Sequence, residues 1–188
     1  MPVISEDRAA ILQQLKNAEE AATLLFARLS RAQANWQPSR GSWSIWQCLD
    51  HLTRTNHVYC QAMLEGITRS RQGVGGTAEI EPGWFGRWFI GKMEPPARTR
   101  YKAMKKAIPA TNGDPQEALR AFVDSHAEVR RVVEYWGQVD FNHVRFQNPF
   151  VAVLRFTVGT GLMVINAHDR RHLWQAKRVE EAEGFPAA

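Results

Sequence analysis

The chain has 188 residues, of which 44% are hydrophobic and 23% charged, a composition typical of a soluble globular protein. Its length suits a single domain over residues 1–188 that folds without a disulfide or metal staple. No run of about 18 apolar residues occurs, and the N-terminus lacks a basic stretch followed by an apolar one, so we expect neither a membrane span nor a signal peptide.

The net charge of +5 and the pI near 9.6 permit binding to nucleic acid. However, basic residues are mixed with acidic ones through most of the chain. We interpret even the densest basic stretch, residues 98–106, as a solvated face rather than a phosphate-binding patch. Nucleic acid is therefore the least favoured partner.

The first predicted helix covers residues 5–32. Ser5 is the expected N-cap, and Glu6 and Asp7 would follow in the first turn, where the helix dipole favours acidic side chains. Apolar residues then recur at alternating spacings of four and three, which is typical of one face of a bundle helix. These residues are Ile11, Leu15, Ala18, Ala22, Leu25 and Leu29.

A linker at residues 35–44 precedes a second predicted helix over residues 45–65. Ser44 and Gln47 have the spacing of a capping box, and Gly66 is the expected end of the helix. The apolar face is formed by Leu49, Leu52, Tyr59 and Met63.

Residues 66–113 are less regular. The glycine-rich segment 72–76 is expected to be a flexible loop, residues 83–96 a short helix or a hairpin-like cover, and residues 97–107 a further helical piece. Four aromatic residues in the middle of this region either cover a site or pack in the core, and core packing is the favoured interpretation. They are Trp84, Phe85, Trp88 and Phe89.

The third predicted helix has the clearest start signal. Asp114 caps it, Pro115 takes the first helical position and Glu117 completes a capping box, while Gly137 is the expected end. Its stripe consists of Leu119, Phe122, His126, Val129, Val133 and Trp136.

Residues 150–159 are rich in β-branched side chains, but they form one candidate strand without a partner, so we predict no sheet. The last predicted helix runs over residues 160–183, with Gly184 beyond its end. One face of it carries Leu162, Ile165, His168, His172, Gln175 and Val179. Four successive amphipathic helices predict an all-α four-helix bundle.

His168 and His172 lie four residues apart on the inward face of the last helix, so their rings can converge on one metal ion. The alternatives are a chance pair in the core or on a charged surface. The zinc-protease helix motif does not apply, because Asp169 follows the first histidine. A pair supplies only two ligands, whereas an open catalytic site needs three.

His51, on the second predicted helix, is the candidate third ligand, and its alternative role is that of a histidine at the bundle surface. His57 should face away from it. For His126, a hydrogen-bonded core histidine is favoured over a fourth ligand or a residue that supports the ligands. Gln175, one turn beyond His172, is a candidate to support the site or to contact a substrate.

The two cysteines lie twelve residues apart in the second predicted helix, about 18 Å in a helix, which is too far for a disulfide. Two free thiols indicate a reducing compartment, most simply the cytoplasm. Cys48 is one turn before His51, but a small core residue is its favoured role. Residues 169–171, between the two histidines of the last helix, are expected on its solvated side or at the rim of the site.

The segments WSIWQCLDHL (Trp43–Leu52) and AHDRRHLWQAKRV (Ala167–Val179), on helices in this order, resemble the DinB-like (DinB/YfiT) superfamily of metalloenzymes. The resemblance implies a four-helix bundle with a long crossover between the second and third helices, often dimeric. It also implies a divalent metal such as zinc or nickel, with a water molecule, on the positions of His51, His168 and His172. Better-understood relatives are transferases and isomerases that use a low-molecular-weight thiol.

These observations favour a metal-dependent enzyme that acts on a small molecule, either a thiol-cofactor transferase or a hydrolase. Its nucleophile would be a metal-bound water or thiolate, with Gln175 supporting the ligands. The alternative is a non-enzymatic metal-binding bundle with a storage, sensing, structural or stress-response role.

Overall fold

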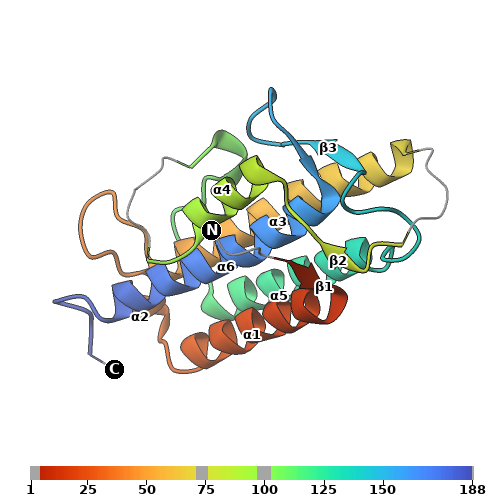
Figure 1. Cartoon of the computed structure of the whole chain (residues 1–188). Helices are drawn as coiled ribbons and strands as arrows, with labels where there is room; N and C mark the ends of the chain where they lie inside the picture. The colour runs from red at the N-terminus through yellow and green to blue at the C-terminus, as the bar shows by residue number, and fades with distance from the viewer. Residues whose placement is uncertain (1–4, 71–75, 97–102, 188) are drawn as a thin grey trace.

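Four long helices form the bundle in the computed structural model, which describes residues 5–70, 76–96 and 103–187. They are α1 (Arg8–Phe26), α3 (Ile45–Arg69), α5 (Pro115–Val133) and α6 (Val158–Glu180). Both α1 and α3 pack against α5 and α6, so neighbours in the bundle include helices far apart in sequence (Figure 1). The predicted all-α four-helix bundle with a long connection between its second and third long helices is confirmed.

The start of α1 differs from the prediction. Asp7, not Ser5, is the N-cap, and its carboxylate accepts a hydrogen bond from the Ala10 amide at 2.8 Å. The preceding residues are extended, because β1 (Glu6–Asp7) pairs antiparallel with β2 (Glu79–Ile80). Pairing with a distant segment therefore replaces the expected first helical turn.

The end of α1 also differs from the prediction. The helix stops at Phe26, and a separate short helix, α2 (Arg31–Asn35), follows it. Ser30 starts α2 with a capping box in which its hydroxyl accepts a hydrogen bond from the Gln33 amide. The second capping signal breaks the predicted single helix into two.

Helix α3 begins at the predicted capping box of Ser44 and Gln47 but does not end at Gly66. The helix continues to Arg69, and Gly66 is buried where β3 (Arg145–Gln147) crosses it. A Cβ atom at Gly66 would lie 2.9 Å from the carbonyl oxygen of Arg145. The glycine therefore allows close contact between helix and strand and does not act as a terminator.

Strand β3 pairs antiparallel with β4 (Arg155–Thr157), and Phe146 lies opposite Phe156. The prediction of no sheet is wrong here, because the β-branched segment has a partner strand. This partner, β3, has only three residues. A three-residue strand shows too little alternation to be recognised in the sequence. The hairpin leads directly into α6, for which Thr157 is the N-cap.

The crossover between α3 and α5 contains α4 (Trp84–Met93), which lies along α6 (Figure 1), and the 3-10 turn η1 (Lys105–Ala107), which contacts α3. Most of the predicted flexible loop (residues 72–76) and of the basic stretch lies outside the described residues. Core packing is wrong for three of the four aromatic residues. Trp84, Trp88 and Phe85 are 72%, 45% and 36% exposed, because α4 buries its Gly86 and Ile90 side instead.

Two separate clusters of buried apolar side chains fill the bundle. One lies toward the hairpin, around Met63 and Phe146, and the other around Leu49 and Phe122. Between the two along the helices lie buried polar residues, which we call the polar layer. It comprises Asn56, Ser125, His126 and Asp169.

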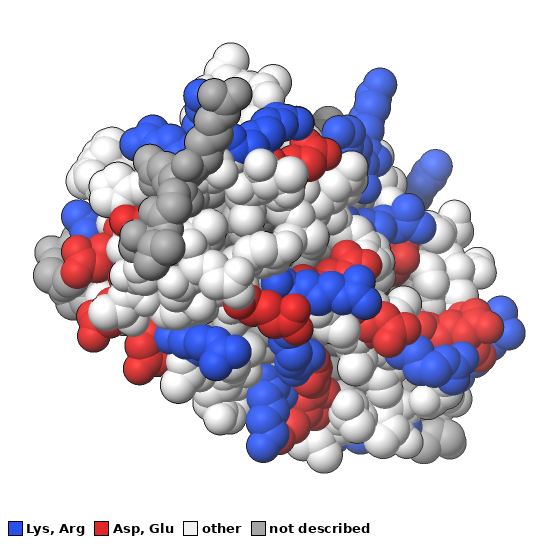
Figure 2. Space-filling model, turned by 90° about the vertical axis from the view of Figure 1, so that its right-hand side faces the viewer, with Lys and Arg blue, Asp and Glu red and all other residues white. Residues whose placement is uncertain are grey.

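Basic and acidic side chains are interspersed across the face shown in Figure 2, so the positive net charge is not concentrated there. Within the described ranges, no helix has the length and apolar character that a bilayer span requires. Both cysteines are buried and free.

Candidate metal centre

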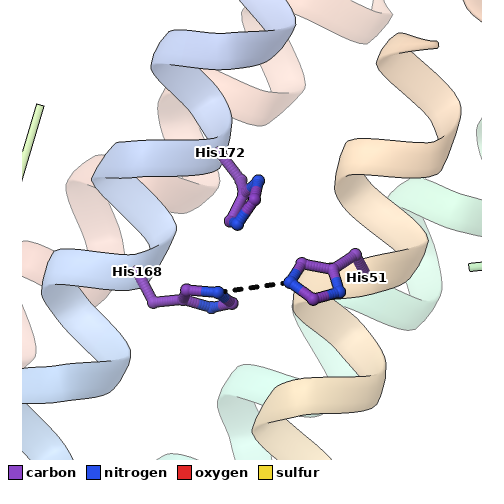
Figure 3. A group of neighbouring side chains, drawn as sticks. All are labelled: His51, His168 and His172. Atoms are coloured by element: carbon purple, nitrogen blue, oxygen red, sulfur yellow. Dashed lines mark hydrogen bonds between the residues drawn. The ribbon is translucent and has the colours of Figure 1, made fainter. Parts of the chain in front are cut away.

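Three histidine side chains from two helices point toward one another in the bundle (Figure 3). His51 projects from the second turn of α3, and His168 and His172 project from successive turns of α6. One nitrogen from each ring lies within 4.8 Å of the other two, and the Nε2 atoms of His51 and His168 are 3.2 Å apart. The four-residue spacing on α6 and the packing of α3 against α6 bring the three rings together.

Two of the rings are oriented by hydrogen bonds on their outer nitrogens. His51 Nδ1 donates to the carbonyl oxygen of Ala107 at 2.6 Å, and His172 Nδ1 donates to Gln175 Oε1 at 2.9 Å. With the proton on Nδ1, the Nε2 lone pair of each ring is available for a metal. The Nδ1 atom of His168 is buried and has no hydrogen-bond partner among the described residues.

Burial keeps the three imidazoles neutral. It is the largest cause of a lowered pKa at His51, His168 and His172, and each of the last two is lowered further by another histidine of the group. Neutral imidazole is the form that binds a metal ion. Facing lone pairs of neutral rings 3.2 Å apart repel unless a proton or a cation lies between them, so these residues fit a metal ion well.

The carboxylates next to these ligands in the sequence point elsewhere. Asp50 accepts hydrogen bonds from Arg54 and from the Ala110 amide, both at 2.8 Å. Asp169 is 1% exposed and bonds to His126 inside the bundle. Among the residues that the structure describes, the candidate ligand set is therefore three nitrogens without an oxygen.

Two positions were expected for residues 169–171: the solvated side of α6, which is wrong, and the rim of the site, which stays a prediction. Asp169 and Arg171 are buried, and Arg170 is half-buried, with its Nε donating to Glu94 at 3.0 Å. Helix α4 lies along α6 and covers Arg171, whose guanidinium donates to the Lys92 carbonyl, whereas Asp169 faces His126 of α5. Sequence reasoning did not place α4 there.

Trp43 packs its ring 4.7 Å from that of His51 and 5.6 Å from that of His172. The indole therefore forms an apolar wall on one side of the histidine group. In the sequence, Trp43 directly precedes the Ser44 cap, but nothing there indicates that its ring reaches the site. The hydrogen bond from His51 to the Ala107 carbonyl could not be predicted either, because every residue type has a backbone carbonyl.

The remaining histidines lie outside the group. His126 is fully buried and hydrogen-bonded to two carboxylates, those of Glu19 and Asp169. His57 and His143 are exposed and bond to Glu128 and Asp140. Cys48 lies in the apolar cluster around Leu49, where burial raises the pKa of its thiol, and it is a small core residue as expected.

The fold and this site define a four-helix-bundle protein with a cluster of three histidines, two of them buried and one partly buried. The chain matches the family model of the DinB superfamily over residues 14–176, and it belongs to that superfamily. Among curated proteins, none matches the chain.

Among solved structures, the chain resembles YfiT from Bacillus subtilis, described as a probable metal-dependent hydrolase with an unusual four-helix bundle topology. The TM-score is 0.60 at 13% identity, over 95% of this chain and 89% of that chain. At this identity the likeness shows a shared fold.

Proposed function

We propose that His51, His168 and His172 bind a divalent metal ion, zinc or nickel, and that the protein is a metal-dependent enzyme acting on a small molecule. The observation that carries the proposal is the convergence of three neutral imidazoles within 4.8 Å. Three protein ligands leave an open position for water or substrate on a tetrahedral ion. When bound, such an ion would supply a Lewis acid that lowers the pKa of a water or thiol at that position.

The residues around the ligands have separate roles in this proposal. The Ala107 carbonyl and the Gln175 side chain hold two rings in the tautomer that presents Nε2 inward. The Trp43 indole keeps water from one side of the histidines. Both effects reduce the reorganisation required when metal and substrate bind.

Two reaction classes remain under the proposal, hydrolysis and transfer to or from a small thiol. The description of YfiT supports the first, and the resemblance to thiol-dependent relatives supports the second. A homodimer and a cytoplasmic location stay predictions, and light scattering on the purified protein measures the oligomeric state.

A purely structural metal is the competing role. Two apolar clusters lie on either side of the polar layer, so the bundle has a core that does not depend on the histidines. We therefore expect a chelator to leave the helical circular dichroism signal in place. Unfolding of the bundle on chelation would favour the structural role.

Metal analysis of tag-free protein tests the ligand assignment. We expect one equivalent of metal in the wild type and its loss in His51→Ala, His168→Ala and His172→Ala. His143→Ala is the matched control, because that imidazole is exposed and bonds to Asp140. Full retention of metal by all three ligand variants would contradict the ligand assignment.

With metal binding established, turnover of thiol-plus-electrophile pairs and of simple esters separates the two reaction classes. In either class, activity should disappear with the chelator and return with added metal. An activity that survives complete metal removal would contradict the proposed mechanism.

A further inference from the structure

The crossover between α3 and α5 supplies the hydrogen-bond acceptor of one candidate ligand. The carbonyl oxygen of Ala107, the last residue of η1, accepts from His51 Nδ1 at 2.6 Å, and Ala107 is 2% exposed. Connecting segments are generally more mobile than the helices they join, so a carbonyl in a loop keeps one position only where the loop is fixed. The side chains that fix the loop at residues 107–110 therefore bear on the histidine group.

Two side chains of α3 hold both backbone polar groups of Ala110, three residues beyond Ala107. The N–H of Ala110 donates to Asp50 Oδ2 at 2.8 Å, and its carbonyl oxygen accepts from Gln47 Nε2 at 3.1 Å. Asp50 directly precedes His51, and Gln47 lies one helical turn before it. The loop is thus bound to the same turns of α3 that carry the candidate ligand.

The link between Ala107 and Ala110 is stiff. The ring of Pro109 fixes its own φ angle, and Pro109 restricts the preceding Ile108 to extended conformations. Ile108 is extended in the structure, with φ −65° and ψ 121°. Because few conformations are open to the link, the anchor at Ala110 also sets the position of the Ala107 carbonyl.

We propose that Asp50 and Gln47 are positioning residues of the metal centre, which hold the Ala107 carbonyl against His51 and so raise the metal affinity of the site. The inference rests on the proposed function and adds two residues that act through a backbone carbonyl. A fixed acceptor at Nδ1 keeps the proton there and orients the ring, so less reorganisation is needed when Nε2 binds a metal ion. Helix α3 therefore positions its own ligand through a residue 56 positions further along the chain.

Zinc affinity and the His51 ring proton test the proposal in the whole protein. Competition with a chromogenic chelator measures the affinity, and NMR of protein with isotope-labelled histidine follows the Nδ1–H signals of His51 and His172. Asp50→Ala removes the acceptor for the Ala110 amide. Asp50→Asn removes the charge but keeps a side-chain oxygen that accepts this hydrogen bond.

Two further variants separate the loop contact from other effects. Arg54→Ala breaks the ion pair with Asp50 and leaves the bond from Asp50 to the loop. Gln47→Glu keeps the acceptor of the Ser44 capping box but, when ionised, has no donor for the loop carbonyl. Gln47→Glu is judged by the His51 proton alone, because its added charge also acts on a cation. Circular dichroism establishes that each variant is folded.

We expect Asp50→Ala to raise the dissociation constant for zinc about tenfold, the lower end of the range for groups that orient a histidine ligand. Asp50→Asn and Arg54→Ala should stay within about threefold of the wild type. The His51 Nδ1 proton should shift upfield and exchange faster with water in Asp50→Ala and in Gln47→Glu. The His172 proton should not change.

Wild-type zinc affinity in Asp50→Ala overturns the inference, as does an equal loss of affinity in Asp50→Asn or Arg54→Ala. An unchanged His51 proton in the variants that fold, or an equal change at His172, overturns it as well. Each of these results leaves the proposed function intact, because zinc is still bound. If the wild type binds no zinc, the proposed function and the inference both fail.

Discussion

The Nε2 atom of His126 lies 3.1 Å from Oδ2 of Asp169 inside the bundle, and Asp169 directly follows the candidate ligand His168. The other ring nitrogen of His126 lies 3.2 Å from Glu19, which is also held by Arg130 at 2.7 Å. Carboxylates accept hydrogen bonds and do not donate them when ionised, so a ring between two of them carries both protons. A charged network thus joins α1, α5 and α6 at the level of the histidine group.

Removal of one partner of the buried His126–Asp169 pair should be more destabilising than removal of both. We expect His126→Leu to lower the free energy of unfolding by about 3–5 kcal/mol, because it leaves the Asp169 carboxylate buried without its cation. The double variant His126→Leu/Asp169→Leu should recover part of this loss. Urea denaturation measures the cycle, and strict additivity of the two changes would contradict the coupling.

The same network predicts how stability depends on pH. Burial alone would lower the pKa of His126, but Asp169 and Glu19 raise it from 6.5 to about 9. The folded state therefore holds the proton more tightly than the unfolded state. The contribution of protonated His126 to the free energy of unfolding is complete below pH 6.5 and is lost as the pH rises through 9. It amounts to about 3 kcal/mol at most.

Glu19 sets the acid limit of this contribution. Burial would raise its pKa, but hydrogen bonds from His126 and Arg130 outweigh burial and lower it from 4.5 to about 2. Stability from Glu19 is present above pH 4.5 and is lost as the pH falls through 2.

Urea denaturation tests the prediction for His126. The urea midpoint should fall between pH 6.5 and 9 for the wild type and stay level for the double Leu variant. Parallel curves for the two proteins would assign the effect to another group.

Substitution of alanine for Gly66 and for Gly91 should change the stability of the protein in opposite directions. Gly66→Ala places a Cβ 2.9 Å from the Arg145 carbonyl, and we expect a loss of about 1–3 kcal/mol of stability. Outside its own helix backbone, no atom of the described residues lies within 4 Å of a Cβ added at Gly91, so Gly91→Ala in α4 should gain up to about 1 kcal/mol from helix propensity. Thermal melts of the two variants check the pair, and equal effects would refute the close contact at β3.

Gln175 should tune metal affinity without being required for it. Loss of its bond to His172 in Gln175→Ala removes the group that fixes the ring tautomer, and we expect metal affinity to fall about 10- to 100-fold. Competition with a chromogenic chelator measures the affinity. Lys177→Ala, at an exposed position of the same helix, is the control. Equal affinity in the two variants would remove Gln175 from the site.

Much of the fold could be predicted from local signals. The capping residues Ser44 and Asp114 start α3 and α5 as expected, and the apolar stripes mark the faces that become buried. Errors occur where a distant segment changes a local preference. Pairing with β2 replaces the first turn of α1, and contact with β3 makes Gly66 a helix residue.

By itself, the sequence determined the spacing of His168 and His172, because four residues along a helix always share a face. Only the tertiary structure decided that His51 meets them, since the packing of α3 on α6 sets that distance. The structure also decided that Asp169 and Arg171 are buried, because α4 and α5 cover the sides of α6 that they occupy. Residue type and periodicity establish which face a side chain takes, whereas what lies opposite that face depends on contacts between segments far apart in the chain.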